Sequence, residues 1–350
     1  MTPQREHPVP LLAPKTGSWK SMNEIVLSVS AELRPPLPAN PRVIFMGTPE
    51  FAVPSLCALA ESDVSLLAVV TQPDRPKGRG RKLLPTPVKE EALRRKIQVF
   101  QPEKASSAEF CEQLRRLAPD LLVVVAFGQI LKKNLLELPS WGVLNIHASL
   151  LPRYRGAAPI QWALLKGERK TGLTAMKMDE GMDTGPIIRQ VEVEIRPFES
   201  AGSLHDRLSA LAGPFLVETI EMIVRGDYGL REQDSSEATY APKIDKSLAR
   251  IQWDSTAEEI AAQICAFDPW PGAQAQVRGK EVKIFSVVSI DASGSGYSPG
   301  TIISVSPKGI EVQTGKGTVT FSQMQLPGKR RLPVAEVVKG FPISVGDLFG

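Results

Sequence analysis

Residues 121–126 read Leu121-Leu122-Val123-Val124-Val125-Ala126, an uninterrupted apolar run that is rich in β-branched side chains. Such a run predicts a short strand that is buried on both faces of a sheet. Further strand-like, mainly apolar runs lie at 43–46, 66–70, 97–100 and 143–147, and helical patterns occur at about 51–59, 88–95 and 106–117. This alternation predicts an α/β fold, with a mostly parallel sheet and helices on both of its faces.

The C-terminal part of the chain has a different pattern. A helical pattern at about 256–266 is followed by short apolar runs at 275–277, 282–288, 301–305, 310–314 and 318–321, which glycine-containing turns separate. Short strands at close spacing predict a small β-barrel or sandwich. A chain of 350 residues is also long for one hydrophobic core. We therefore expect two domains, at 41–244 and 245–350.

Residues 1–40 are expected to be a disordered N-terminal extension. Prolines punctuate this segment, and its one short apolar stretch, 25–27, has no partner nearby. The segment lacks the uninterrupted apolar region of a secretory signal. A flexible arm, a later start at Met22 and a transit peptide remain open, although the acidic residues Glu6, Glu24 and Glu32 are unusual for a transit peptide.

The overall composition excludes several classes of protein. The apolar fraction of 42% and the charged fraction of 23% are typical of a globular protein. No apolar run approaches the roughly 20 residues that a membrane-spanning helix requires. Cys57, Cys111 and Cys265 have neither metal-binding nor redox spacing and fit the reduced cytoplasm, where we expect the protein. The net charge of +4 does not by itself imply nucleic-acid binding, although a local basic patch can provide it.

Several motifs of cofactor chemistry are missing from the sequence. The first strand ends in Gly47-Thr48-Pro49, without the G-x-G-x-x-G fingerprint that lets a dinucleotide approach the backbone. There is no phosphate-binding P-loop, no H-E-x-x-H and no C-x-x-C. Nicotinamide chemistry and a zinc site are therefore disfavoured, and we expect no metal.

Three polar residues form a candidate catalytic set. Asn145 and His147 are two residues apart on a predicted strand, so their side chains point to the same face. Asp183 lies in the turn-forming segment 180–186. The amide can polarise a carbonyl, the imidazole can transfer a proton, and the carboxylate can fix the tautomer and orientation of the imidazole. This equipment suits the transfer of an acyl group to an amine. Taken singly, His147 also fits a buried strand-end histidine, and Asp183 fits a turn former.

A basic segment follows the second predicted strand. Proline and glycine disfavour a helix there and predict a flexible loop. The loop is either a solvated surface loop or a site that contacts phosphates of a nucleic acid through charge. Its basic residues are Arg75, Lys77, Arg79, Arg81 and Lys82.

Together these motifs resemble the methionyl-tRNA formyltransferases, a branch of the folate-dependent formyltransferases. The similarity runs from about Arg42 to near the C-terminus and rests on segments 47–52, 72–76, 145–152, 155–161, 183–185, 267–271 and 326–329. The resemblance implies a Rossmann-like catalytic domain and a C-terminal barrel similar to an OB fold. It implies 10-formyltetrahydrofolate as formyl donor, methionyl initiator tRNA as acceptor, and a monomer without a membrane partner.

The resemblance also implies roles for single residues. Asn145, His147 and Asp183 take the catalytic positions, and the basic loop takes the position of an element that surrounds the tRNA acceptor stem. The folate site is expected to comprise Ser149, Leu150, Leu151, Pro152, Phe127 and Gly128. Three alternatives remain. They are a formyltransferase for a small amine, an RNA-binding protein with an inactive cleft, and, most remotely, a dehydrogenase.

Overall fold

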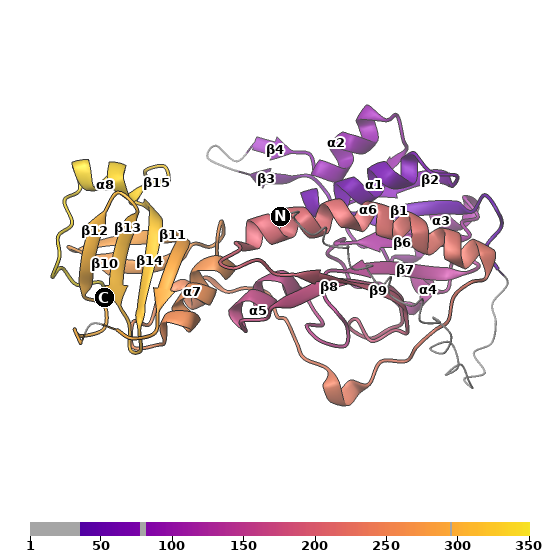
Figure 1. Ribbon diagram of the computed structural model, residues 1–350. Coiled ribbons are helices and arrows are strands. Elements are labelled where there is room, and N and C mark those ends of the chain that lie inside the picture. The colour runs from indigo at the N-terminus through magenta and orange to yellow at the C-terminus, as the bar shows by residue number, and fades with distance from the viewer. Residues whose placement is uncertain (1–35, 78–81, 295) are drawn as a thin grey trace, which may run out of the picture. The chain divides into compact units, whose positions relative to one another are not determined.

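The computed structural model describes residues 36–77, 82–294 and 296–350, in which two large sheets are joined to the helices and loops around them (Figure 1). The described residues belong to one compact unit. Most of the predicted N-terminal extension, up to residue 35, lies outside the described residues. Leu37 is only 4% exposed and packs into the main core, so a residue before the predicted boundary at 41 takes part in that core.

The larger sheet has seven strands in the order β5-β2-β1-β6-β7-β8-β9. Its strands are β1 (Arg42–Gly47), β2 (Ser65–Val70), β5 (Val99–Phe100), β6 (Leu121–Val125), β7 (Gly142–His147), β8 (Lys170–Lys177) and β9 (Ile187–Glu194). The pairings from β5 to β7 are all parallel, and β8 and β9 add antiparallel partners at one edge. The prediction of a mostly parallel α/β sheet is confirmed.

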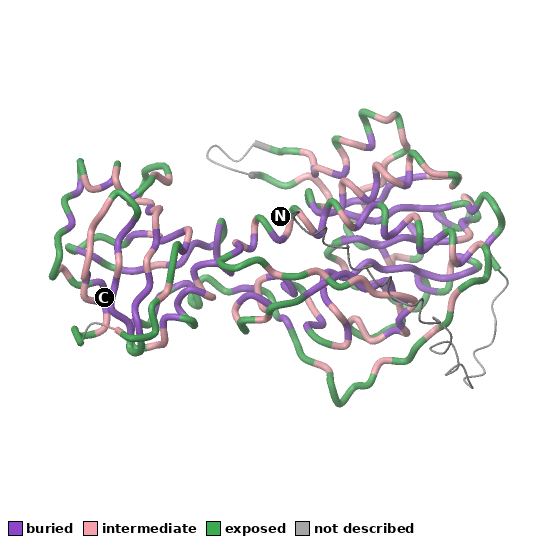
Figure 2. The backbone as a smooth tube through the Cα atoms, viewed as in Figure 1, coloured by how far each residue is buried: buried purple, intermediate pink, exposed green. Residues whose placement is uncertain are grey.

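Alternate residues of the central strands enter two separate apolar clusters, one on each face of the sheet. Val43 and Phe45 of β1 pack into one cluster, whereas Ile44 and Met46 pack into the other. This double burial explains the continuous apolar runs, and the central strands β1, β6 and β7 are buried along almost all of their length (Figure 2). The helices of this region are α1 (Val53–Ala60), α2 (Pro87–Arg94), α3 (Ala108–Arg116), α4 (Lys133–Leu136), α5 (Pro159–Leu165) and α6 (Ala201–Arg225).

The segment 150–245 was assigned no helix or strand from sequence, and it contains α5, β8, β9 and the long helix α6. The Ser200 hydroxyl caps the N-terminus of α6 by accepting from the Ser203 N–H, and Gly226 ends the helix in the left-handed conformation. Apolar residues of α6, such as Leu204 and Leu208, are fully buried and belong to the main apolar cluster of the sheet. This segment supplies the antiparallel edge of the sheet and part of the candidate site.

The prediction of a flexible loop at 74–82 is partly wrong. Its two ends form the antiparallel strands β3 (Arg75–Lys77) and β4 (Lys82–Leu84). Such a two-stranded hairpin tolerates Pro76 because neither strand is the interior strand of a sheet. The Asp74 carboxylate fixes the start of the hairpin by accepting hydrogen bonds from Lys89 (2.6 Å) and Gln101 (2.7 Å).

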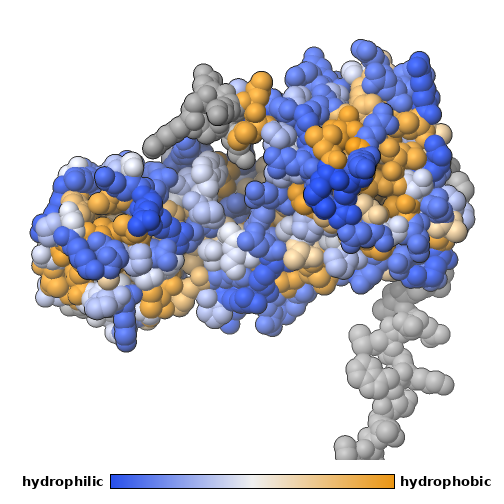
Figure 3. All heavy atoms as spheres, turned by 90° about the horizontal axis from the view of Figure 1, so that it is seen from above, coloured by the Kyte–Doolittle hydropathy of each residue, from blue (hydrophilic) through white to orange (hydrophobic). Residues whose placement is uncertain are grey.

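The second large sheet is antiparallel, in the order β10-β11-β14-β13-β12, with β15 on β14. Its elements are α7 (Ala257–Ala266), β10 (Ala273–Val277), β11 (Lys280–Asp291), β12 (Ile302–Ser306), β13 (Gly309–Gln313), β14 (Thr318–Gln325), β15 (Leu332–Pro333) and α8 (Val334–Gly340). The last residues connect its two edges, because Phe349 bridges Val277 and Leu348 bridges Thr301. They close the sheet into a small barrel, as predicted. Hydrophobic areas on the face seen in Figure 3 are bordered by hydrophilic residues.

Candidate active site

The carboxyl end of β7 places two predicted residues in one cleft. Asn145 and His147 are each 7% exposed, and both line a cavity of about 650 Å³. β6 and β8 flank β7, so the end of the strand is fixed from both sides. The cavity is also lined by Asp183 and by apolar residues that include Phe51, Phe127, Ile130 and Met182. The structure therefore brings the three candidate catalytic side chains to one cavity of ligand size.

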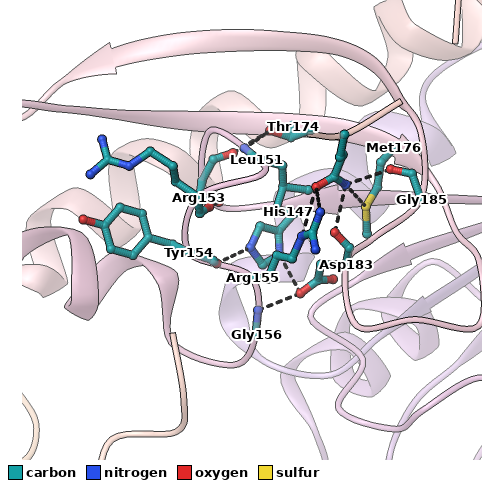
Figure 4. Close-up of polar contacts among 12 residues, drawn as sticks. His147, Leu151, Arg153, Tyr154, Arg155, Gly156, Thr174, Met176, Asp183 and Gly185 are labelled. Carbon is teal, nitrogen blue, oxygen red and sulfur yellow. Dashed lines mark hydrogen bonds and ion pairs between the residues drawn. The ribbon is translucent and has the colours of Figure 1, made fainter. Parts of the chain in front are cut away.

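The hydrogen bond of His147 identifies which ring nitrogen carries its hydrogen. Nε2 lies 2.9 Å from the main-chain oxygen of Tyr154 (Figure 4). A carbonyl oxygen only accepts, so Nε2 must donate. In a neutral imidazole the lone pair then lies on Nδ1, which is 3.6 Å from Oδ2 of Asp183. Nδ1 is therefore the ring nitrogen that can take up and release a proton.

The Tyr154 carbonyl is held in place by both the side chain and the main chain of its residue. The phenol donates to Glu168 (2.6 Å), and the N–H donates to Thr239 Oγ1 (2.9 Å). Burial, with Glu168 nearby, raises the pKa of the Tyr154 phenol, so it stays a donor at neutral pH. The residue has a φ of 62°, a left-handed conformation that these contacts maintain. Sequence reasoning assigned Tyr154 no role, because its main-chain oxygen gives no sequence signal.

Asp183 is oriented by a main-chain donor and by its own backbone conformation. Its Oδ2 accepts a hydrogen bond of 2.8 Å from the Gly156 N–H, and its φ is 55°. Gly156 has a φ of 118°, and a Cβ at this position would lie 2.9 Å from the carbonyl oxygen of Ala241. Only glycine fits this close approach, which brings the N–H to the carboxylate.

The structure separates the predicted folate residues into two groups. Phe127 and Gly128 follow β6 and line the cavity. The Phe127 carbonyl accepts hydrogen bonds from Thr48 Oγ1 (2.8 Å) and Gln72 Nε2 (3.3 Å), which fix its position. The segment 149–152 does not line the cavity.

Residues 149–152 form a turn that is bonded to β8. The fully buried Ser149 donates to the Arg153 carbonyl (2.6 Å) and its own carbonyl accepts from Thr174 (2.6 Å). The Leu151 N–H donates to Thr174 Oγ1 (3.1 Å). These contacts support the path of the chain from His147 to Tyr154, and a direct role of the segment in folate binding stays a prediction.

Of the predicted tRNA-binding residues, only Arg75 is described with its side chain, and it is exposed on β3. Lys77 and Lys82 lie at the facing ends of β3 and β4. Arg79 and Arg81 lie outside the described residues. Within the described ranges, no group of three or more acidic, histidine or cysteine side chains has the arrangement of a metal site. The same ranges contain no helix that is both long and apolar enough to cross a membrane.

Two family profiles match this chain. One, for formyl transferase, covers residues 41–220, and the other, for the formyl transferase C-terminal domain, covers residues 243–342. The first range contains every residue that lines the cavity, and the second contains α7 and all strands of the barrel.

Relatives match over almost their entire length. A methionyl-tRNA formyltransferase of Geobacter sulfurreducens is 47% identical over 312 residues, which is 89% of this chain and 98% of that protein. One of Pelotomaculum thermopropionicum is 45% identical over 309 residues, 88% of this chain and 98% of that protein.

Solved structures with lower sequence identity share the fold. HypX from Aquifex aeolicus in complex with tetrahydrofolic acid has a TM-score of 0.60 at 20% identity, and the match covers 88% of this chain but only 48% of HypX. WlaRD, a sugar 3N-formyl transferase, has a TM-score of 0.59 at 21% identity, with 83% of this chain and 99% of WlaRD covered. At these identities the likeness concerns the fold alone.

Proposed function

The chain belongs to the formyl transferase family, and we propose that it transfers the formyl group of 10-formyltetrahydrofolate to the α-amine of methionyl initiator tRNA. The product, formylmethionyl-tRNA, serves the initiation of translation. The near-complete match to methionyl-tRNA formyltransferases carries this proposal, because it includes the C-terminal barrel as well as the cleft. The sugar formyltransferase WlaRD shares the fold at only 21% identity, whereas these relatives are 45% and 47% identical.

We propose that residues 41–244 form the catalytic domain and residues 245–350 a tRNA-binding domain. The β3–β4 hairpin, with Arg75, Lys77, Arg79, Arg81 and Lys82, is proposed to contact the tRNA phosphates. The separate apolar cluster of the barrel supports the division of the chain. We further propose a monomer in the cytoplasm, which is consistent with three unpaired cysteines.

The amine attacks the formyl carbon directly in this mechanism. An α-amine has a pKa of about 8, so part of it is neutral and nucleophilic near pH 7. The new carbon–nitrogen bond forms while the carbonyl electrons move to oxygen. Asn145 donates its amide N–H to this oxyanion at the buried end of β7. The intermediate then collapses, the bond from carbon to the folate nitrogen breaks, and tetrahydrofolate leaves.

His147 moves the proton that this exchange requires. The attacking amine loses a proton and the departing folate nitrogen gains one, so no net acid or base is consumed. Nδ1 takes the proton and returns it, because Nε2 stays bonded to the Tyr154 carbonyl. While Nδ1 is protonated, the Asp183 carboxylate at 3.6 Å stabilises the positive charge.

The test is formyl transfer by the purified full chain with 10-formyltetrahydrofolate as donor. Methionyl initiator tRNA is compared with a dTDP-linked amino sugar, and formylated product and released tetrahydrofolate are both measured. We expect stoichiometric formylation of the tRNA and no product from the sugar. Formylation of the sugar alone would assign the chain to a small-amine activity. Release of no tetrahydrofolate with either acceptor would leave an RNA-binding protein with an inactive cleft.

A further inference from the structure

We propose that Gln233 and Arg155 are positioning residues for formyl transfer, which hold Asp183 in the orientation that faces His147. The inference rests on the proposed function of the cleft. Neither residue lines the cavity, so both act through Asp183 rather than on a substrate. Arg155 and Gln233 are hydrogen-bonded to each other, and Gln233 is hydrogen-bonded to the main chain of Asp183, so three segments distant in the sequence meet there.

The carboxamide of Gln233 makes four hydrogen bonds to oxygen and nitrogen atoms, besides a longer contact of 4.0 Å from Nε2 to the sulfur of Met176 (Figure 4). Its Nε2 donates to the main-chain oxygens of Asp183 and Gly185, each at 2.8 Å. Its Oε1 accepts from Arg155 Nε (3.1 Å) and Arg155 Nη2 (2.8 Å). Because the guanidinium only donates, it fixes which end of the amide faces Asp183. Gln233 therefore ties the Asp183 loop to Arg155.

Arg155 is an unusual anchor because its charge is buried. The residue is 3% exposed, and among the described residues no carboxylate lies within ion-pair distance of it. A buried guanidinium without an acidic partner is costly, so its polar contacts must be well made. The main chain of Arg155 is hydrogen-bonded to the segment that follows Gln233. Its N–H donates to the Thr239 carbonyl (2.9 Å), and its carbonyl accepts from the Ala241 N–H (2.7 Å).

The Asp183 loop needs such support. The left-handed conformation of Asp183, at φ 55°, costs on the order of 1–3 kcal/mol and persists only when neighbours enforce it. Gln233 holds the carbonyls on both sides of Thr184, while Gly156 holds the Asp183 carboxylate. Without Gln233, the Asp183 carboxylate keeps its hydrogen bond from Gly156, but the main chain on both sides of Thr184 loses its hydrogen bonds. The separation of 3.6 Å from His147 then changes.

Three full-chain variants test the proposal. In Gln233→Glu the new carboxylate still pairs with Arg155 but cannot donate to the loop carbonyls, and Gln233→Ala removes both functions. For each we expect kcat to fall by about 10- to 100-fold, with the KM of both substrates within about twofold, because a misplacement of about 1 Å costs that much. Gln263→Ala is the matched control. Its carboxamide also bridges two carbonyls, of Leu248 (2.7 Å) and Arg250 (3.1 Å), and we expect unchanged kcat.

A double-mutant cycle and a spectroscopic readout complete the test. If Gln233 acts through Asp183, Gln233→Ala changes kcat by less than about twofold in an Asp183→Asn background. The ¹⁵N shifts of His147 should change in Gln233→Glu but not in Gln263→Ala, whether or not the protein formylates tRNA. The positioning role would be overturned by unchanged ¹⁵N shifts in Gln233→Glu. It would also be overturned if Gln233→Ala lowered kcat by the same factor in the Asp183→Asn background as in the wild type. An inactive wild type with shifts that respond as expected would instead overturn only the proposed function.

Discussion

At the scale of single residues, a main-chain oxygen sets the chemistry of the candidate base. The sequence led us to expect that Asp183 fixes the tautomer of His147. In the structure the Tyr154 carbonyl fixes the tautomer, because it accepts the hydrogen on Nε2 of His147, and Asp183 faces Nδ1. Strand periodicity and strand ends predict that Asn145 and His147 face one cleft, whereas the place of Asp183 beside them was implied by the family resemblance. They could not predict Tyr154 or Gln233, whose roles depend on positive φ angles and on contacts between distant segments.

Replacement of His147 by alanine tests the proton transfer directly. We expect kcat to fall at least about 100-fold, the lower end of what general acid–base catalysis contributes. The dissociation constant for methionyl-tRNA should stay within about twofold, because the imidazole is 7% exposed and lies inside the cleft. Single-turnover transfer and equilibrium tRNA binding check the two parts. A variant with nearly full turnover would exclude this role of His147.

Glu91 predicts how stability depends on acid pH. Arg94 first, and then Arg95 and the Cys57 thiol, donate to this carboxylate and lower its pKa from 4.5 to about 2, against the opposing effect of burial. The unfolded chain therefore binds more protons than the folded chain between these values, and stability is lost as pH falls through that window. Because Arg94 is exposed and solvent screens its charge, we expect the free energy of unfolding to fall by on the order of 1–2 kcal/mol. Urea unfolding of wild type and Glu91→Gln from pH 6 to pH 2.5 measures it, and equal slopes would contradict the assignment.

At the scale of elements, sequence patterns were most reliable where a strand is buried on both faces. The runs at 43–46 and 121–126 correspond to β1 and β6 within one residue at each end. β9 was not predicted, because it lies at the edge of the sheet and mixes apolar with charged residues. The hairpin was predicted as a loop because its short strands carry prolines and charges, and only their mutual pairing shows them as strands.

The hairpin leads to a prediction about tRNA binding. Neutralising Arg79, Arg81 and Lys82 together should weaken binding and reduce the slope of log K against log salt by about 2, since each lost phosphate contact contributes about 0.7–0.9. The KM for the folate donor should not change. A matched triple variant at Arg116, Lys132 and Lys133, exposed basic residues of α3 and the start of α4, should keep the wild-type slope. Equal slopes for the two triple variants would remove the hairpin from the tRNA interface.

At the scale of the whole molecule, one short helix contributes to two hydrophobic cores. Ile260 and Ile264 of α7 belong to the cluster of the barrel. Ala266 and Phe267, at the end of the same helix, belong to the main cluster of the seven-stranded sheet. The boundary proposed at residue 244 therefore divides the chain into a catalytic and a tRNA-binding part, but it does not divide the two hydrophobic cores completely. Because protein interiors are close-packed, we infer that a packing defect at the end of α7 also disturbs the core of the larger sheet.

Phe267→Ala tests this shared packing. The side chain is fully buried, so its removal should cost about 3–5 kcal/mol. Although Phe267 follows residue 244, we expect faster amide hydrogen exchange in β6 and β7, because its ring packs in their cluster. The matched variant Phe321→Ala removes an equally buried ring that contacts Phe349 within the barrel, and it should accelerate exchange mainly in β11 to β14. If Phe267→Ala accelerates exchange only in the barrel strands, the two cores are independent and α7 belongs to the barrel alone.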